Sequence, residues 1–293
     1  MEYKIVNGLV IGASSGLYDV ESEGGAQIVQ CKPRGVFRKN EQTINVGDRV
    51  NVTYDDVISE VLERKNSIIR PPLSNLDILF FVVSSCEPSP NFLLLDKFLA
   101  VASHKSITPV IVLTKLDLKA AQDIIDIYSK TNIRIICVDY SSQKTKDEIL
   151  ALMSGKISAF TGNSGVGKST LLNYLGNFGI TTAQISKKLG RGRHTTRSVS
   201  LFKLPCGGYV ADTPGFSTFD TNRYDIIKKD ELAFCFEEFE QFSHACRFRD
   251  CSHTTELGCK VIEAVNKGLI SKCRHSSYCT MYDEAKQLKD WEI

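Results

Sequence analysis

Two short motifs in this chain carry residue types that bind nucleotides, and they stand in an unusual order. Residues 162–169 read Gly-Asn-Ser-Gly-Val-Gly-Lys-Ser and match the phosphate-binding pattern G-x-x-x-x-G-K-[ST] at every fixed position. Residues 114–117 read Thr-Lys-Leu-Asp, the [NT]-K-x-D pattern that recognises guanine. An ordinary GTPase has the phosphate loop first. The reversed order predicts a GTPase domain whose elements have been circularly permuted.

The phosphate loop provides donors for a bound triphosphate. Its glycines let backbone N–H groups converge on phosphate oxygens at the start of a helix. Lys168 is expected to reach the β- and γ-phosphates, and the Ser169 hydroxyl is the expected Mg²⁺ ligand. The residues expected to line this part of the site are Gly162, Asn163, Ser164, Gly165, Val166, Gly167, Lys168, Ser169 and Thr170. A strand-like segment before the loop and a helix-forming one after it argue against a chance match.

The guanine motif offers a carboxylate whose partners are absent from adenine. Asp117 can accept hydrogen bonds from the guanine N1–H and exocyclic amine, and Lys115 can lie along the base or brace the phosphate loop. An ATPase is the alternative that Asp117 disfavours. Thr114 stands where asparagine is usual, and T-K-x-D also arises by chance at strand ends. Ser141 and Ser142 follow the next predicted strand, where a second base-contacting loop belongs, although their neighbours form no diagnostic pattern.

Residues downstream of the phosphate loop have the features of γ-phosphate sensors. Asp212 begins a D-x-x-G motif after a predicted strand, so its carboxylate can hold Mg²⁺ through water while the Gly215 N–H approaches the γ-phosphate. The segment 187–197 contains five cations and two glycines. It is either a solvated basic loop or a mobile switch in which Thr195 or Thr196 ligates Mg²⁺. We prefer the switch, whose cations would also meet a polyanion such as RNA.

The catalytic water needs an orienting group that the usual position lacks. Phe216 follows Gly215 where many GTPases have glutamine, and a phenyl ring cannot hold water by hydrogen bonding. His194 is the best local candidate for that role. We therefore predict slow hydrolysis by the isolated protein and faster hydrolysis when a partner orders the 187–197 segment.

A compact group of cysteines and a histidine predicts a metal site near the C-terminus. The expected ligands are Cys246, Cys251, His253 and Cys259. Three thiolates and one imidazole fill the tetrahedral shell of a structural zinc ion. The alternative is a group of unpaired buried thiols. Looser spacing makes Cys273, His275 and Cys279 spectators. The basic residues around the cluster are Arg247, Arg249, Lys260 and Arg274, which either face a nucleic acid or are solvated charges.

The elements that would position these residues form three regions. Residues 1–65 read as short strands broken by glycine turns, which suits a small closed barrel such as an OB-fold. A β-extension packed on the next domain is the alternative. Residues 66–222 alternate apolar strands with helical segments, which indicates a mostly parallel sheet with helices on both sides as the GTPase domain. Residues 223–293 read as a mainly helical zinc-binding domain.

Composition sets limits on location and partners. The 293 residues carry a net charge of +2, which is too small to indicate a nucleic-acid binder by itself. No signal peptide or apolar run of membrane-spanning length is found, so we expect a cytoplasmic protein without membrane contact. Reduced cysteines then favour metal ligation over disulfides. We expect the remaining cysteines to be mostly buried, namely Cys31, Cys86, Cys137, Cys206 and Cys235.

With these motifs in hand, the chain resembles the RsgA (YjeQ/YloQ) family of small-ribosomal-subunit-dependent GTPases. The resemblance covers essentially the full length. It follows the order T-K-x-D, G-x-S-G-V-G-K-S, G-R-G-R-H-T-T, D-T-P-G-F and C-x4-C-x-H-x-x-E-x-G-C, which Glu256 and Gly258 complete. The whole combination is more specific than any single motif.

This resemblance implies an N-terminal OB-fold, a circularly permuted GTPase domain and a C-terminal zinc domain. Family members bind the small subunit near its decoding centre late in assembly, and they hydrolyse GTP chiefly when bound to it. The family's catalytic histidine falls on His194. We expect GTP or GDP, Mg²⁺ and one zinc ion per chain, with a monomer contacting rRNA. The alternatives are a permuted GTPase of the large subunit and an RNA-binding assembly protein with a vestigial nucleotide site.

Overall fold

The computed structural model describes residues 6–25, 27–39, 43–53, 55–69, 71–176, 199–212 and 225–288. The chain divides into two compact units. The first comprises Met1–Ile78, Lys146–Phe160 and Ser169–Phe216, and the second comprises Leu79–Thr145, Thr161–Lys168 and Ser217–Ile293. Each unit is assembled from separate stretches of sequence, and the domain boundaries at residues 65 and 222 stay predictions.

The first five strands form the barrel predicted for the N-terminal region. They are β1 (Val6–Ser14), β2 (Leu17–Ser22), β3 (Ile28–Pro33), β4 (Arg49–Val52) and β5 (Val57–Val61), with the short helix α1 (Gly35–Lys39) after β3. The strands pair in the order β1-β2-β3-β5-β4, and β4 pairs back onto β1 to close the barrel. Residues of alternating strand positions fill it, among them Val10, Val20 and Val50. The OB-like barrel is confirmed, and the β-extension alternative is wrong.

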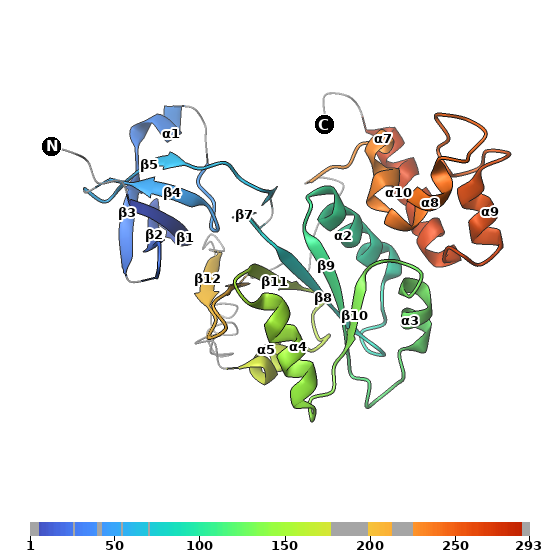
Figure 1. The fold of residues 1–293 in the computed structure, drawn as a ribbon, viewed down its shortest axis with the longest axis horizontal. Helices are drawn as coiled ribbons and strands as arrows, with labels where there is room; N and C mark the ends of the chain where they lie inside the picture. The colour runs from blue at the N-terminus through green and yellow to red at the C-terminus, as the bar shows by residue number, and fades with distance from the viewer. Residues whose placement is uncertain are drawn as a thin grey trace. The chain divides into compact units, whose positions relative to one another are not determined.

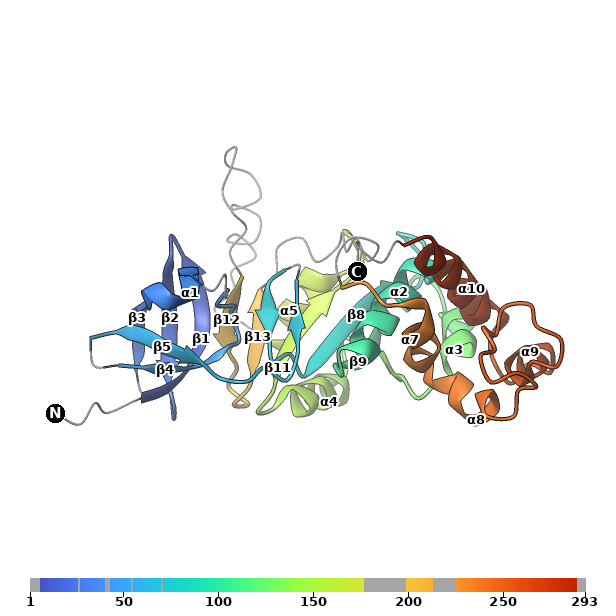
Figure 2. The same ribbon diagram turned by 90° about the horizontal axis from the view of Figure 1, so that it is seen from above.

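A second group of strands in the first unit continues from the barrel. It contains β11 (Ile157–Thr161, of which Thr161 belongs to the second unit), β12 (Ser200–Lys203) and β13 (Tyr209–Asp212). β13 is parallel to β11 and antiparallel to β12, and β12 is antiparallel to barrel strand β1, with Gly12 opposite Ser200. Figure 2 shows β12 lying between β1 and β13. The barrel therefore shares a hydrogen-bonded strand edge with the segment that ends at Asp212.

A buried carboxylate reinforces this junction. Glu21 on β2 is 5% exposed. It accepts a hydrogen bond from the Tyr209 hydroxyl at 2.6 Å and pairs with the Lys203 ammonium at 2.5 Å. Burial by itself would raise the pKa of Glu21, but the hydrogen bonds from Lys203 and Tyr209 and the Lys203 charge outweigh it, and the pKa lies below its ordinary value. Glu21 is thus an ionised group shared by three strands.

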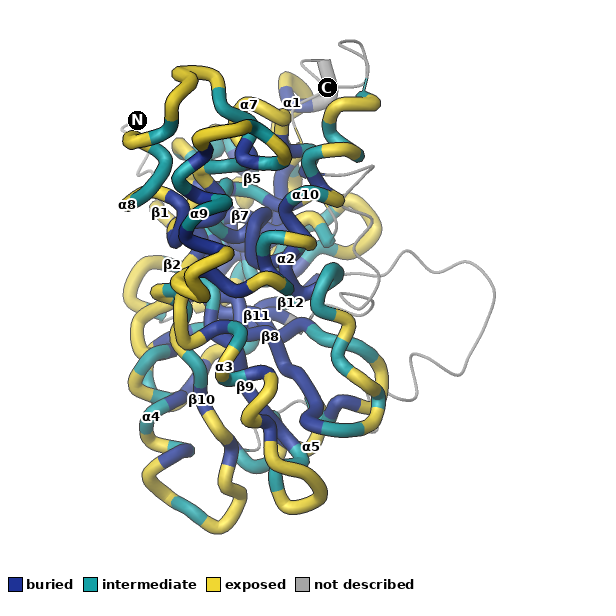
Figure 3. The backbone as a smooth tube through the Cα atoms, turned by 90° about the vertical axis from the view of Figure 1, so that its right-hand side faces the viewer, coloured by how far each residue is buried: buried dark blue, intermediate teal, exposed yellow. Residues whose placement is uncertain are grey.

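The second unit contains a parallel strand pair with helices packed beside it. Its elements are β8 (Ile78–Ser84, of which Ile78 belongs to the first unit), α2 (Phe92–His104), β9 (Thr108–Thr114), α3 (Gln122–Tyr128) and β10 (Arg134–Cys137). β9 and β10 are parallel, with Val110 opposite Arg134, and α2 runs beside β9 (Figure 1). Every residue of β8 is buried (Figure 3), as expected for a strand covered on both faces.

The helix that follows β9 begins later in the chain than the apolar spacing of the sequence indicates. Helical spacing starts at Asp117, but α3 begins only at Gln122. Lys115 has a φ of +59°, and its carbonyl accepts the Leu118 N–H at 3.0 Å. This turn keeps the guanine motif out of the helix and leaves its side chains at the end of β9. The remaining connecting elements are β6 (Ser67–Ile68), β7 (Leu73–Ser74), α4 (Gln143–Met153) and α5 (Lys168–Leu175).

The C-terminal part of the second unit is mainly helical, as predicted. Its helices are α7 (Lys229–Leu232), η1 (Ala233–Cys235), η2 (Glu237–Phe239), α8 (Glu240–Ser243), α9 (Lys260–Asn266) and α10 (Lys272–Gln287). Aromatic rings pack in its core. The Phe239 and Tyr278 ring centroids lie 4.9 Å apart with an interplanar angle of 71°, which is a favoured edge-to-face geometry. α10 packs against α2, and the two helices share an ion-pair network.

That network corrects the expectation for Arg274, which is not a surface charge. Its side chain is 2% exposed, and its guanidinium donates to Asp96 at 2.8 Å and to Glu238 at 2.8 and 3.1 Å. Asp96 also accepts the hydroxyl of Tyr128 at 2.8 Å. The partners come from α2, α3 and η2, far apart in sequence, so no local pattern could have indicated this burial.

Candidate nucleotide site and Cys/His cluster

The phosphate loop connects a buried strand to a helix. All five residues of β11 are buried, and α5 starts at Lys168. Between them Gly162, Gly165 and Gly167 have φ values of +143°, +82° and +96°, which disfavour any residue with a side chain. A methyl group on Gly162 would also collide with the Val82 carbonyl oxygen. The glycines are therefore required by the backbone path, as the motif predicts.

Lys168 folds back over the loop that precedes it. Its ammonium donates to the Asn163 carbonyl at 2.8 Å and also to the Gly162 carbonyl. Burial lowers the pKa of Lys168, because a partly desolvated ammonium is less stable than a hydrated one. Phosphate oxygens beside the ammonium would supply negative charge that compensates for the hydration lost on burial. Ser169 and Thr170 follow in the first turn of α5, and Thr170 is exposed, as is Ser164.

The guanine motif and the phosphate loop are joined by a hydrogen bond. The Thr114 hydroxyl is completely buried and lies 2.6 Å from the Val166 carbonyl oxygen. Lys115 is held at two points. Its carbonyl accepts a hydrogen bond from the Ser85 hydroxyl at 2.8 Å, and its ammonium donates to the Glu87 carbonyl. Asp117 is exposed at the end of the turn. Segments 52 residues apart thus form one side of a common site.

This geometry assigns Thr114 a different contact from the one its motif suggests. Its hydroxyl points to the phosphate loop, and a hydroxyl has a single proton to donate. Thr114 therefore braces the loop, while Lys115 and Asp117 remain the candidates for contact with a base. The contact between Thr114 and a base stays a prediction.

The loop after β10 also reaches this site. Ser141 donates to the Asp139 carboxylate from both its hydroxyl, at 2.6 Å, and its N–H, at 2.9 Å, and these bonds lower the pKa of Asp139. The Ser142 N–H donates to the Asp139 carbonyl at 3.1 Å. The hydroxyl of Tyr140 lies near Gly167. Sequence reasoning missed Tyr140, and the only available signal was its place beside Ser141.

The γ-phosphate residues are described only in part. Asp212 is the last residue of β13, which is parallel to β11 with Ala211 opposite Ala159. The carboxyl ends of parallel strands meet at one sheet edge, where ligands of open α/β sheets bind. His194, Thr195, Thr196 and Gly215 lie outside the described residues. Their roles stay predictions.

The four predicted metal ligands converge. The candidate donor atoms of Cys246, Cys251, His253 and Cys259 all lie within 4.8 Å of one another. The Sγ atoms of Cys246 and Cys259 are 3.9 Å apart, and His253 Nδ1 is 3.4 Å from Cys259 Sγ and 3.7 Å from Cys246 Sγ. Two thiolates 2.3 Å from a tetrahedral zinc ion would be roughly 3.8 Å apart. The donor set therefore fits zinc in chemistry and spacing.

The backbone around the cluster is held by hydrogen bonds that suit thiolate ligands. The Lys260 N–H points to Cys246 Sγ at 3.3 Å, and the Ile262 N–H points to Cys259 Sγ at 3.5 Å. Both N–H groups belong to the first turn of α9, where positive partial charge favours anions. His253 has a φ of +58°, and its carbonyl lies 2.7 Å from His275 Nε2. His275 therefore supports the cluster without belonging to it.

Glu256 fixes the turn inside the cluster. Its carboxylate accepts the N–H groups of Ser252 at 2.8 Å and of Thr254 and Thr255 at 3.1 Å. Burial opposes ionisation, but the hydrogen bonds dominate and lower the pKa of Glu256 to about 2. An alanine here would leave these three backbone donors without their acceptor.

Other cysteines behave less uniformly than expected. Cys31 and Cys235 are buried, but Cys137 is exposed because it lies at an outward position of β10. Cys279 Sγ lies 3.8 and 3.9 Å from the two ring nitrogens of His275. Within the described part of the chain, the only group of three or more candidate ligands is the Cys246–Cys259 cluster. Cys273 and Cys279 are thus outside it, as predicted.

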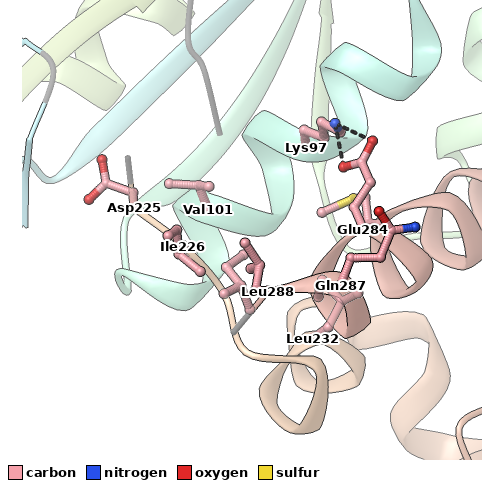
Figure 4. Close-up of a pocket in the computed structure, with 11 residues that line it drawn as sticks. Lys97, Val101, Asp225, Ile226, Leu232, Glu284, Gln287 and Leu288 are labelled. Atoms are coloured by element: carbon pink, nitrogen blue, oxygen red, sulfur yellow. Dashed lines mark hydrogen bonds and ion pairs between the residues drawn. The ribbon is translucent and has the colours of Figure 1, made fainter. Parts of the chain in front are cut away.

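A separate cavity of about 230 Å³ lies between α2 and α10. Figure 4 shows Val101, Ile226 and Leu288 on its apolar side and the Lys97–Glu284 ion pair at its edge. The ammonium and carboxylate are 2.6 Å apart. None of the predicted nucleotide or metal residues lines this cavity, so it is not the predicted site.

Comparison with known proteins gives matches along the chain. A sequence model of the RsgA GTPase matches residues 61–222, and one of the RsgA N-terminal domain matches residues 7–58. "Small ribosomal subunit biogenesis GTPase RsgA" of Streptococcus pneumoniae is 40% identical over 290 residues, covering 97% of this chain and 96% of that protein. The protein of the same name from Geobacillus thermodenitrificans is 40% identical over 297 residues, covering 97% and 99%.

Two crystal structures share the fold. YjeQ from Thermotoga maritima superposes with a TM-score of 0.80 at 33% identity, covering 97% of this chain and all of that one. YloQ, described as a circularly permuted GTPase, superposes with a TM-score of 0.78 at 34% identity, covering 97% and 96%. In the described residues, no helix is both long and apolar enough to cross a membrane.

Proposed function

Because this chain belongs to the RsgA GTPase family, we propose that it hydrolyses GTP to GDP and phosphate on the small ribosomal subunit. It would act there as a late assembly factor that contacts rRNA. We expect it to work in the cytoplasm and as a monomer. The relatives named as small ribosomal subunit biogenesis GTPases support the choice of the small subunit as its partner. The observation that supports the nucleotide site is the 2.6 Å contact between Thr114 and the Val166 carbonyl.

The reaction transfers a phosphoryl group to water, so the protein acts by positioning and charge neutralisation. Lys168 and the loop N–H groups would hold the β- and γ-phosphates, and Ser169 and Asp212 would hold Mg²⁺, which neutralises charge on the phosphates. Asp117 would select guanine. The Lys168 ammonium is partly desolvated in the loop, which strengthens its attraction for phosphate.

The Cys/His cluster would hold one zinc ion as a structural centre. All four positions of a tetrahedral ion would be filled by protein, so no position is left for a substrate. Cys259 also caps α9 by accepting the Ile262 N–H, which ties the metal ligands directly to a helix. This centre would keep residues 246–259 in a fixed conformation on the subunit.

The experiment that tests this function is GTP hydrolysis with and without purified ribosomal subunits. We expect slow turnover alone and a large increase with small subunits, no comparable increase with large subunits, and poor competition by ATP. Stimulation by large subunits would favour the rival permuted GTPase. Binding to small subunits without any hydrolysis would favour an RNA-binding protein with a vestigial site.

His194 provides a second arm of that experiment. His194→Ala should reduce the subunit-stimulated rate by about 10²- to 10⁴-fold, the range for loss of a group that assists proton transfer or orients water. GDP affinity should be nearly unchanged, because the base and phosphate contacts come from other residues. Equal stimulated rates for wild type and variant would reject this role for His194.

A further inference from the structure

Ser85 holds the guanine motif from a segment that the motif does not include. It follows strand β8 directly and is 4% exposed. Its N–H donates to the Thr114 carbonyl at 3.0 Å, and its hydroxyl donates to the Lys115 carbonyl at 2.8 Å. These two carbonyls belong to the peptide groups on either side of the Lys115 Cα atom. One buried residue therefore fixes both peptides around Lys115.

Lys115 needs such support because of its backbone conformation. Its φ of +59° lies in the left-handed region, which residues with a side chain rarely adopt and which persists only where surrounding contacts determine it. The Lys115 carbonyl also accepts the N–H groups of Leu118 at 3.0 Å and Lys119 at 3.3 Å. Lys115 is thus the first residue of the turn that contains Asp117. The Ser85 hydroxyl anchors this turn to the end of β8.

The position of the Asp117 carboxylate depends on this turn. Asp117 is exposed, so the backbone of the turn, rather than packing in a core, directs its side chain. To recognise guanine, the carboxylate must meet the N1–H and the exocyclic amine at the same time. Hydrogen bonds weaken steeply when their angles leave the favoured range. A small rotation of the turn would therefore reduce base discrimination, while the phosphate contacts of residues 162–169 would remain.

We propose that Ser85 is a positioning residue for base discrimination. By anchoring the Lys115 carbonyl, it holds Asp117 where the carboxylate meets both donors of guanine. This inference rests on the proposed function, because it assumes that the site binds a guanine nucleotide. Ser85 does not touch the base itself, since its single hydroxyl proton is used on the Lys115 carbonyl. It acts on specificity through the turn.

The test compares equilibrium binding of GDP and inosine diphosphate, which lacks the exocyclic amine of guanine. For the wild-type protein, this loss removes a hydrogen bond to a carboxylate and should weaken binding by about 10- to 100-fold. Ser85→Ala removes the hydroxyl but keeps the N–H bond to Thr114. GDP should then bind about 2- to 10-fold more weakly. The preference for GDP over inosine diphosphate should fall by a similar factor, because inosine diphosphate loses less when the carboxylate is displaced.

Ser158→Ala is the matched control. Ser158 is fully buried on β11, and its hydroxyl has no hydrogen-bond partner in the described part of the chain, so its loss should leave both affinities unchanged. Equal thermal unfolding temperatures would verify the fold of Ser85→Ala. If that variant does not fold, Ser85→Cys takes its place. A thiol is only a weak donor, so the preference for GDP should fall in the same direction.

The ratio of the two affinities separates positioning from a purely structural role. A structural Ser85 would lower the unfolding temperature of the variant and leave the ratio at its wild-type value. That unchanged ratio overturns the proposal, as does a wild type that binds GDP and inosine diphosphate equally. Failure of the wild type to prefer GDP over ADP would instead reject the proposed function. The two failures are therefore distinguishable.

Discussion

Arg274 illustrates how burial changes the role of a charged residue. In an exposed position it would contribute to a basic surface, but here two carboxylates surround it, and its guanidinium lies 4.4 Å from the Phe236 ring centroid. The adjacent charges of Glu238 and Asp96 outweigh the burial penalty and raise the pKa of Arg274. It therefore stays charged and holds α10 to α2 and η2.

Replacing this arginine should destabilise the second unit. Arg274→Met removes the cation and leaves Asp96 and Glu238 buried without it, which costs about 3–5 kcal/mol. Urea unfolding followed by near-ultraviolet circular dichroism measures the change. The matched control is Arg249→Met, an exposed residue, which should change stability by less than about 0.5 kcal/mol. A loss below about 1 kcal/mol for Arg274→Met would contradict this account.

At the scale of elements, β12 is the link between the barrel and the strand that ends at Asp212. It pairs with β1 on one side and β13 on the other, and it starts shortly after the predicted switch segment 187–197. Hydrogen bonds of both strand pairs and the Glu21 contacts hold it in place. A displacement of β12 would therefore be transmitted to the barrel.

Glu21→Gln should weaken this junction in a pH-dependent way. The folded-state pKa of Glu21 lies below its ordinary value of 4.5, so the ionised group stabilises the fold above that pH. The contribution is lost as pH falls through the folded-state pKa. At pH 7 we expect faster hydrogen exchange in β1 and β12 of the variant, corresponding to a loss of about 1 kcal/mol in the free energy of local opening.

Measuring the hydrogen-exchange rates of β1 and β12 at pH 7 and pH 3, corrected for intrinsic exchange, shows whether the effect of Glu21→Gln comes from lost charge. The difference between wild type and Glu21→Gln should shrink at the lower pH, because wild-type Glu21 becomes increasingly protonated there. Glu60→Gln, which changes an exposed carboxylate of β5, serves as the control with no expected difference. A pH-independent effect of Glu21→Gln would indicate altered packing rather than lost charge.

At the scale of the whole molecule, the order of segments along the chain matters less than where they meet. Thr114 precedes Val166, yet the two are in contact as they would be if the motifs stood in the ordinary order. Circular permutation is tolerated because a fold depends on contacts and not on which loop is cut. Permutation does alter the connection downstream of the Asp212 motif, where the chain continues to the Cys/His cluster.

Metal removal should affect that last region selectively. We expect one zinc per chain by elemental analysis, and chelation should increase hydrogen exchange across residues 246–259, because metal binding and local folding are coupled. The first strands of the barrel should be unaffected. Cys251→Ser should lower zinc content, whereas Cys206→Ser, outside the cluster, should not. Full protection of residues 246–259 after zinc loss would contradict a structural metal site.

Local patterns in the sequence determined most elements and both sites. Glycine spacing dictates the phosphate loop, because positive φ angles need glycine at Gly162, Gly165 and Gly167. The short spacing of the Cys/His motif favours convergence of its ligands, because closing short loops around a metal ion costs little conformational entropy. Alternating apolar residues predicted the barrel, although not its shared edge with β12.

Tertiary structure alone decided the contacts between distant segments. Burial of Arg274 depends on carboxylates 178 and 36 residues away, the Glu21 contacts span up to 188 residues, and the place of Tyr140 depends on where β10 ends relative to Gly167. A side chain's charge state, exposure and partner are set by groups that only the folded chain brings within a few ångströms. Local sequence specifies the backbone, and long-range packing specifies the environment in which each functional group works.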